Sequence, residues 1–210
     1  MNVKEAYNIW AAQYDTNENK TRDLEAVSLR QTLSNITTEN CLEIGCGTGK
    51  NTEWLVQKAK QLTSVDLSEE MLAKAKAKIS ASNISFIQAD ITKEWEFPGN
   101  AFDLVTFSLV LEHIEDLDDI FKKLSSVTTT NAYVYIGELH PFKQYNGTKA
   151  RFETEKGLNI VTCFNHNISD FTGAAKKNGF QIIEVAEYFD NNDRAATPRI
   201  LTLLLKKSWV

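Results

Sequence analysis

The sequence has few cysteines, few prolines and no long apolar run, and these shortages exclude several classes of protein. Three cysteines in 210 residues, Cys41, Cys46 and Cys163, are too few and too scattered for a disulfide framework or a cysteine-rich zinc site. No segment approaches the roughly 18 apolar residues of a membrane span, and the N-terminal residues lack the apolar core of a signal peptide. We therefore expect a cytoplasmic protein that has no membrane span and no metal site.

The chain also lacks an excess of positive charge. Its 23 Lys and Arg residues are outnumbered by 28 Asp and Glu residues, which gives a formal net charge of −5. A protein that binds a nucleic-acid backbone usually carries a basic face. The one basic run places Lys74, Lys76 and Lys78 at alternate positions, which do not share one face of a helix. We therefore expect no nucleic-acid partner.

What the sequence does contain is a regular alternation of helical and extended segments. Helices are expected over residues 3–13 and 20–34, and then at about 50–60, 69–80, 117–126 and 168–178. Apolar runs typical of strands lie at 41–44, 62–65, 84–87, 102–107, 132–136, 182–185 and 200–205. The alternation predicts an α/β fold, with a doubly wound, mainly parallel sheet that has helices on both faces. We expect one domain, spanning residues 1–210.

Two segments depart from this alternation. Residues 188–199 form a polar loop without helical period, so the last two strands are expected to pair as an antiparallel hairpin at one edge of the sheet. Residues 140–166 show no clear period, and loops of this length are usually functional or disordered. We expect this insertion and the N-terminal helices of residues 1–36 to roof a binding pocket.

A glycine-rich loop follows the first strand and is the most informative motif. Residues 43–51 read Glu-Ile-Gly-Cys-Gly-Thr-Gly-Lys-Asn, and such glycines permit a tight turn and close backbone approach to a ligand. The dinucleotide fingerprint would need glycine where Lys50 stands. The phosphate-binding loop would need glycine at Ile44 and a hydroxyl at Asn51. Neither of these two nucleotide motifs is therefore matched.

Acidic residues end the next two strands. Asp66 lies at the end of the second strand, where a carboxylate can accept hydrogen bonds from both hydroxyls of a ribose. Asp90 ends the third strand, and Ser108 ends the fourth. Ligands of open α/β sheets bind outside the carboxyl ends of the strands. The sequence therefore predicts one nucleoside-binding cleft at this edge.

These motifs resemble those of the class I S-adenosylmethionine-dependent methyltransferases, strongly over residues 38–140 and more loosely over 168–206. Residues 43–49 look like the first motif of that family, and Asp66 looks like its ribose-binding acid. Asp90 and Ile91 resemble the acid and the apolar residue beside the adenine, and residues 97–105 and 111–114 resemble the fourth motif. The similarity is greatest to the small-molecule branch that includes ubiquinone and menaquinone biosynthesis methyltransferases.

The resemblance implies a seven-stranded sheet of order 3-2-1-4-5-7-6 with strand 7 antiparallel, and S-adenosylmethionine as the cofactor. The cofactor-binding residues that the resemblance implies are Tyr14, Glu43, Gly45, Gly47, Gly49, Asp66, Leu67, Met71, Asp90, Ile91 and Ser108. For two of them, Tyr14 and Met71, packing in the core is an equally good interpretation.

Methyl transfer from a sulfonium is a direct displacement, in which the cofactor brings its own leaving group and the protein orients the reactants. The chain lacks the Asn/Asp-Pro-Pro-aromatic run and the Pro-Cys pair that the resemblance associates with methylation of amino groups and cytosine carbons. A small-molecule acceptor is therefore expected. His140 and His166 are the candidates for a catalytic base, whereas His113 fits a structural role better.

Several alternatives stay open at this point. Phe142, Tyr145, Phe152 and Phe164 could line an apolar acceptor site or form a small core of the insertion. The protein could be a non-catalytic regulator or partner subunit that binds the same cofactor. A nicotinamide-dependent oxidoreductase is a weaker alternative, because the glycine spacing opposes it.

Overall fold

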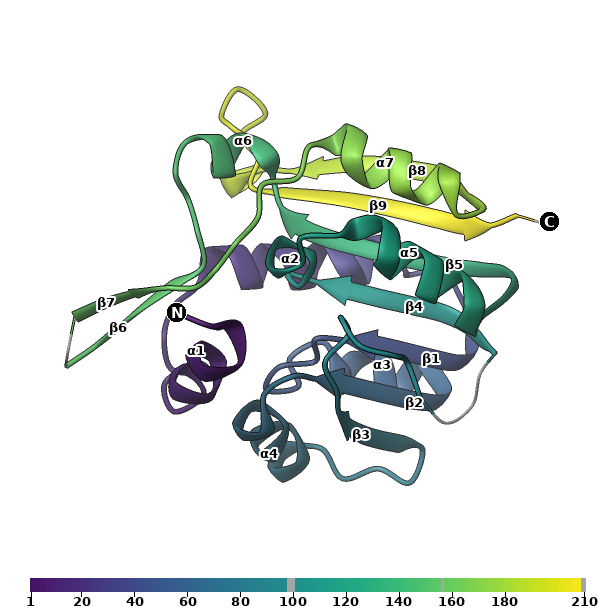
Figure 1. Ribbon diagram of the computed structural model, residues 1–210, viewed down its shortest axis with the longest axis horizontal. Helices are drawn as coiled ribbons and strands as arrows, with labels where there is room; N and C mark the ends of the chain where they lie inside the picture. The colour runs from purple at the N-terminus through teal and green to yellow at the C-terminus, as the bar shows by residue number, and fades with distance from the viewer. Residues whose placement is uncertain (98–100, 156, 209–210) are drawn as a thin grey trace.

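The protein is built around a twisted seven-stranded sheet, described by a computed structural model for residues 1–97, 101–155 and 157–208 (Figure 1). The strand order is β3-β2-β1-β4-β5-β9-β8. The strands are β1 Thr38–Ile44, β2 Ala59–Asp66, β3 Ile84–Gln88, β4 Phe102–Ser108, β5 Thr128–Leu139, β8 Phe180–Tyr188 and β9 Ile200–Lys207. Strand β9 is antiparallel to β5 and β8, while the other pairs are parallel. Since β8 and β9 are the sixth and seventh strands of this sheet, the expected order is confirmed.

Helices cover both faces of the sheet, as expected. On one face, α5 and α7 pack on Leu42, Val105 and Ile136 to form the larger core. On the other face, α2 and α3 cover Cys41, Leu104 and further apolar side chains. The helices are α1 Val3–Trp10, α2 Lys20–Thr32, α3 Thr52–Lys58, α4 Glu69–Lys78, α5 Leu117–Val127, α6 Pro141–Tyr145 and α7 Ile168–Lys177, with short 3-10 helices η1 Leu111–His113 and η2 Asp190–Asn192.

Local sequence signals explain the ends of several elements. The Ser68 hydroxyl accepts a hydrogen bond from the Met71 amide and so caps α4. Gly179, with φ +86°, follows α7, because glycine adopts the left-handed conformation that ends a helix at little cost. The first helix ends at Trp10 rather than at residue 13, and turns occupy the residues that follow it. The sequence motif expected over 97–105 includes residues 98–100, which lie outside the described residues.

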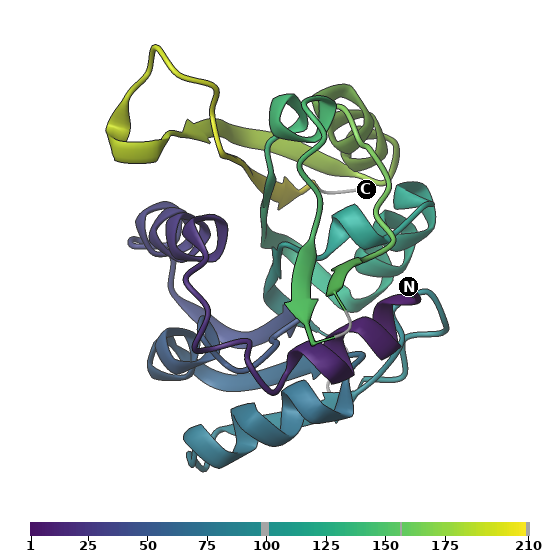
Figure 2. The ribbon, with the colours of Figure 1, turned by 90° about the vertical axis from the view of Figure 1, so that its left-hand side faces the viewer.

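The insertion at 140–166 contains elements that the sequence does not reveal. It comprises α6 and a hairpin of β6 Arg151–Thr154 and β7 Gly157–Ile160. The aromatic ring of Phe152 stacks on Trp10 of α1 with 5.0 Å between centroids. Figure 2, which looks at the carboxyl ends of the parallel strands, shows the hairpin and α1 lying together across this edge of the sheet. Phe142 and Tyr145 are exposed, so they do not form a core of the insertion, and they line none of the three cavities described below.

Candidate functional site

The carboxyl ends of β1, β2 and β4 and the end of β3 meet at a cavity of about 280 Å³, here called the main cavity. Its wall combines strand ends, the glycine loop and the N-terminal segment. It is lined by Asn2, Val3, Tyr7, Tyr14, Ile44, Gly45, Gly47, Val65, Asp66, Leu67, Ala89, Asp90, Ile91, Thr92, Ser108, Leu109, Val110, His113 and Ile114. Eight of the eleven residues that the sequence suggests for a cofactor are among them. Glu43, Gly49 and Met71 are not.

The glycine loop forms the floor of the main cavity, and two of its positions require glycine for different reasons. Gly45 has φ +74°, and a Cβ atom there would lie 2.1 Å from the Cγ2 of Val110. Gly47 has φ +53°, and a Cβ atom there would have only the Tyr14 ring within reach, at 4.0 Å. The loop can therefore approach Val110 closely at Gly45 and leaves open space above Gly47.

Gly49 and Met71 serve packing instead. A Cβ atom at Gly49 would lie 2.8 Å from the Cδ1 of Ile79 and 3.3 Å from the Cβ of Ala75, so this glycine lets the loop pack on α4 and the residue that follows it. Met71 is fully buried in a cluster with Ala6 and Trp10 of α1. The structure thus corrects the expectation that these two residues line a cofactor cavity.

Asp66 is held in the wall by the backbone around it. Its Oδ2 accepts a hydrogen bond of 2.8 Å from the Gly47 amide, and its Oδ1 accepts one of 2.8 Å from the Ser68 amide. Burial raises the pKa of this carboxyl, and the two amides counteract the rise. Each oxygen of a carboxylate has a further lone pair, so the fixed group can accept hydrogen bonds from two hydroxyls of a ligand.

A second group lies farther along the same wall, where β3 ends. Leu67 and Ile91 present apolar side chains to the main cavity. Asp90 lies beside them, and its Oδ1 accepts hydrogen bonds from the amide and the hydroxyl of Thr92, at 2.9 and 2.6 Å. An apolar slot with a carboxylate at one end suits a flat heterocycle that carries a hydrogen-bond donor.

A smaller cavity of about 50 Å³, the side cavity, opens on the other side of the glycine loop. Buried carboxylates and one guanidinium share its wall, namely those of Glu25, Glu43 and Arg22. Burial raises the pKa of Glu43 to about 7, against hydrogen bonds of 2.7 Å that its Oε2 accepts from the hydroxyls of Thr52 and Ser64. The wall of the side cavity therefore contains both acidic and basic groups.

Glu25 of α2 belongs to a buried hydrogen-bond network beside Ser108. The side-chain Nδ2 of Asn51 donates to Glu25 Oε2 at 2.8 Å and to the Ser108 hydroxyl at 3.2 Å. Tyr135 donates to Glu25 Oε1 at 3.0 Å. The Oδ1 of Asn51 is buried without a hydrogen-bond partner. An acceptor in this state favours a ligand that carries a donor, such as an ammonium group.

A third cavity of about 330 Å³, the roof cavity, lies under the N-terminal segment and the start of the hairpin. Tyr14 and Leu109 line the main, side and roof cavities alike. Leu109 has φ +57°, a left-handed conformation that is costly for leucine, and its amide donates to the Gly137 carbonyl at 2.8 Å. The three cavities therefore meet at these two side chains.

The structure does not bring His140 or His166 to the main cavity, so the expectation of a base at these positions is wrong. His140 is fully buried, with its Nε2 3.0 Å from Glu187 Oε1 and its Nδ1 accepting from the Phe142 amide. The Nε2 of His166 lies 2.7 Å from the Ile114 carbonyl oxygen. Both imidazoles are engaged in structural hydrogen bonds.

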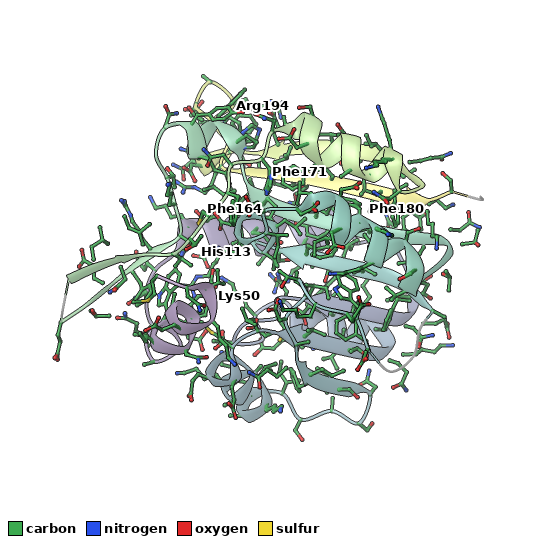
Figure 3. All side chains as sticks on the ribbon, in the orientation of Figure 1. Lys50, His113, Phe164, Phe171, Phe180 and Arg194 are labelled. Atoms are coloured by element: carbon green, nitrogen blue, oxygen red, sulfur yellow. The ribbon has the colours of Figure 1, made fainter. Side chains whose placement is uncertain are left out.

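His113 lies in the wall of the main cavity instead, between α1 and the hairpin (Figure 3). Its Nδ1 lies 2.8 Å from the Thr162 carbonyl oxygen and donates to it, which leaves Nε2 as the acceptor. The Tyr7 hydroxyl, 2.8 Å away, donates to Nε2. The sequence favours a structural role for His113, but its position directly after the fourth strand is the signal that points to the site.

Comparisons with known proteins agree with this architecture. The family model described as "Methyltransferase domain" matches residues 42–136, which hold the glycine loop, Asp66, Asp90 and β4. The matched segment is similar to that family and covers less than half of the chain. The strand order is the one that the resemblance to class I S-adenosylmethionine-dependent methyltransferases implies.

Solved structures share the fold of this chain. An S-adenosylmethionine-dependent methyltransferase of Mesorhizobium loti is 22% identical with a TM-score of 0.72, over 89% of this chain and 100% of that one. The N-methyltransferase NodS of Bradyrhizobium japonicum, solved with S-adenosylhomocysteine, is 20% identical with a TM-score of 0.72, over 97% of each chain.

Among sequence relatives, the ubiquinone biosynthesis O-methyltransferase of Vibrio atlanticus is 28% identical over 138 residues. The match covers 64% of this chain and 57% of that protein. The chain likewise spans less than two thirds of the length of most curated relatives that it matches. Within the described residues, no helix is long and apolar enough to cross a membrane, and no cluster of side chains suits a metal ion.

Proposed function

We propose that the protein is an S-adenosylmethionine-dependent methyltransferase that acts on a small-molecule acceptor. The observation that carries the proposal is the carboxylate of Asp66, fixed by two backbone amides in the wall of the main cavity. Asp66 would accept hydrogen bonds from the ribose hydroxyls of the adenosine, and the apolar side chains of Leu67 and Ile91 would contact its purine. Asp90 lies at the end of that slot, within the wall that would face the adenine.

The side cavity fits the methionine end of the cofactor. That end is a zwitterion, and the side cavity offers the carboxylates of Glu25 and Glu43 to its ammonium and the guanidinium of Arg22 to its carboxylate. The unpartnered Oδ1 of Asn51 gives the ammonium a further acceptor. The residues of the main and side cavities, which share Gly45 and Gly47, would thus complement the two halves of the cofactor.

When bound, S-adenosylmethionine supplies a methyl group on a positively charged sulfur. The protein's own part is to orient the acceptor in line with that methyl group, which can lower a barrier by roughly 7–11 kcal/mol. Tyr14 and Leu109, at the junction of the three cavities, are placed to hold the reactants and exclude water there. The relatives named above include an N- and an O-methyltransferase, which supports methyl transfer and leaves the accepting atom open.

Binding of the cofactor can be tested directly by calorimetry. Asp66→Ala should weaken binding of S-adenosylhomocysteine at least about tenfold, because charge-assisted hydrogen bonds contribute about 1.5–3 kcal/mol each. Asp118→Ala removes a half-buried carboxylate on α5 that lines none of the three cavities, so it is the matched control and should bind normally. Heat with a nicotinamide dinucleotide, and none with S-adenosylmethionine or S-adenosylhomocysteine, would overturn the proposal.

Turnover requires a separate measurement. A screen of small phenols, amines, thiols and carboxylates, read out as release of S-adenosylhomocysteine, should return at least one acceptor. Binding of the cofactor without release from any acceptor would instead favour a non-catalytic regulator or partner subunit.

A further inference from the structure

We propose that the roof cavity binds a methyl acceptor that carries an oxyanion group, a carboxylate or a phosphate, together with a hydroxyl or an amine. The inference rests on the proposed function, since it assigns the substrate class of that reaction. The cavity lies between α1, the connection to α2 and residues 148–151. Its volume of about 330 Å³ is within the range of sites for small molecules.

Three residues of the roof cavity carry buried polar atoms without a hydrogen-bond partner. These atoms are the indole Nε1 of Trp10, the guanidinium Nε of Arg22 and the carboxyl Oε2 of Glu112. A buried polar group without a partner costs folding free energy, and buried groups in native proteins are nearly always paired. Two donors and one carboxyl oxygen in one cavity match a ligand that supplies an oxyanion and a hydrogen-bond donor.

The charge at the roof cavity also favours an anion. Lys20, Lys149 and Arg151 are exposed at this cavity, and Arg22 lies deeper in it. Among the described residues, no carboxylate lies within ion-pair distance of Arg22, which donates to the carbonyl oxygens of Tyr14 and Asn17 and stacks on the Tyr14 ring.

The charged residues of the roof cavity are mainly basic, although the chain as a whole is acidic. Arg199 also lines the roof cavity, but two contacts of 2.6 Å with Asp190 balance its charge. The acidic residues of the wall are Glu18 and the buried Glu112. A chain of net charge −5 thus gathers basic groups at this opening, which attracts anionic ligands.

The cavity is placed to deliver such a molecule to the methyl group. It meets the main and side cavities at Tyr14 and Leu109, and Tyr7 lines both it and the main cavity. We assign the oxyanion to the side of Arg22, Lys149 and Arg151. The hydroxyl or amine then lies toward Glu112, which follows β4 in η1.

The test uses pairs of acceptors that differ only in the anionic group. One pair is 4-hydroxybenzoate with its methyl ester, a second is 4-hydroxyphenyl phosphate with hydroquinone, and a third is 3-aminopropionate with its amide. Turnover is read as release of S-adenosylhomocysteine, and binding is measured by calorimetry on protein saturated with S-adenosylhomocysteine. At least one acid should be preferred over its neutral partner by about tenfold in kcat/KM, and the preferred pair distinguishes a carboxylate from a phosphate.

The variant for this test is Lys149→Gln combined with Arg151→Gln, since both side chains are exposed and their loss leaves the fold intact. The double variant should raise KM for the acid about fivefold or more, while S-adenosylhomocysteine affinity changes less than about twofold. The matched control is Lys176→Gln combined with Arg194→Gln, which removes two exposed charges outside the cavity. Arg22 stays unchanged here because it also lines the side cavity.

Three outcomes would overturn the assignment. The first is equal or better turnover of the neutral partner in every pair that reacts. The second is a double variant that behaves like the control. The third is cofactor binding with no acid bound or methylated. Failure of S-adenosylmethionine and S-adenosylhomocysteine to bind at all would instead overturn the proposed function.

Discussion

The floor and the roof of the cleft are built in different ways. The floor consists of the glycine loop and the ends of β1, β2 and β4, whose relative positions are fixed by continuous parallel pairing. The roof consists of α1 and the hairpin of β6 and β7, which meet through a separate small cluster around Trp10 and Phe152. A rigid floor can position one invariant ligand, whereas a separate roof can differ without disturbing the sheet.

The floor and the roof also differ in whether their buried polar atoms have hydrogen-bond partners within the protein. In the floor, both oxygens of Asp66 have backbone partners. In the roof cavity, Trp10, Arg22 and Glu112 each carry an unpartnered polar atom. Asp66 is therefore held in place without a ligand, whereas the three groups of the roof cavity, like the Oδ1 of Asn51 in the side cavity, lack partners unless a ligand supplies them.

The largest effect is expected from a methyl group added to the floor. Gly45→Ala would bring a Cβ within 2.1 Å of Val110 Cγ2 at a φ of +74°. Overpacking and left-handed strain together should lower the free energy of unfolding by about 2–5 kcal/mol and abolish measurable cofactor binding. Urea denaturation and calorimetry measure the two effects.

The control for this substitution separates strain from crowding. Gly147→Ala creates a residue at φ +83° with no atom within 4 Å of the new Cβ, so it should cost only about 1 kcal/mol and leave cofactor binding intact. Equal losses in the two variants would show that close packing of the floor is unimportant.

A smaller effect is expected from pH. Burial raises the pKa of Glu43 to about 7 and that of Glu138 to about 8, from an ordinary value of 4.5. The unfolded chain ionises these groups near the ordinary value, so their contribution to stability is full below that pH and is lost progressively as the pH rises from there through 7 to 8. The ligand-free protein should lose unfolding free energy over that whole interval, by up to about 1.4 kcal/mol per pH unit for each group.

Glu43→Gln isolates one of the two groups. The carboxamide keeps an oxygen that can accept from Thr52 or Ser64 but does not titrate, so the pH dependence of urea denaturation should become shallower. Glu39→Gln changes an exposed carboxylate at the start of β1 and should leave the slope unchanged. A slope that Glu43→Gln leaves unaltered would contradict this assignment.

The smallest effect is expected at the contact between roof and floor. Tyr7→Phe keeps the ring in the N-terminal cluster and removes the hydrogen bond to His113. Because a neutral hydrogen bond contributes about 0.5–1.5 kcal/mol, affinity for S-adenosylhomocysteine should fall by up to about tenfold. Hydrogen exchange of α1 should quicken, while that of β1 and β4 stays slow.

His166→Ala gives the contrasting case. His166 itself does not line the main cavity and bonds only to the backbone carbonyl of Ile114, which does, so its loss should lower stability with a smaller change in cofactor affinity. If His166→Ala weakened the cofactor more than Tyr7→Phe, the division between roof contact and structural histidine would be wrong.

The floor was predictable from sequence because its signals are local and regular. Alternating apolar runs located every strand of the main sheet, and the spacing from Gly45 to Asp66 placed both at one edge. The contacts inside the glycine loop were harder to predict from the sequence. That Gly49 packs on α4 rather than on a ligand depends on Ile79 and Ala75, which no spacing rule brings together.

The roof could not be predicted from the sequence because its packing depends on contacts between residues far apart in the chain. Phe152 is buried only because Trp10, far away in sequence, stacks on it, whereas Phe142 in the same segment remains exposed. The histidines show the same limit: a position after a strand indicates the edge of the sheet but not where the side chain lies. His113 reaches the main cavity, and His140 is buried against Glu187 behind it.

The backbone conformation of Leu109 has a consequence for engineering this protein. Its left-handed backbone, at φ +57°, costs free energy that glycine would not, and yet its side chain is a shared wall of all three cavities. Selection for heat resistance alone would reward glycine at this position and would at the same time remove the leucine side chain from the place where the three cavities meet. If the proposed function is right, a more stable backbone at this residue would therefore come at the expense of the methyl-transfer site.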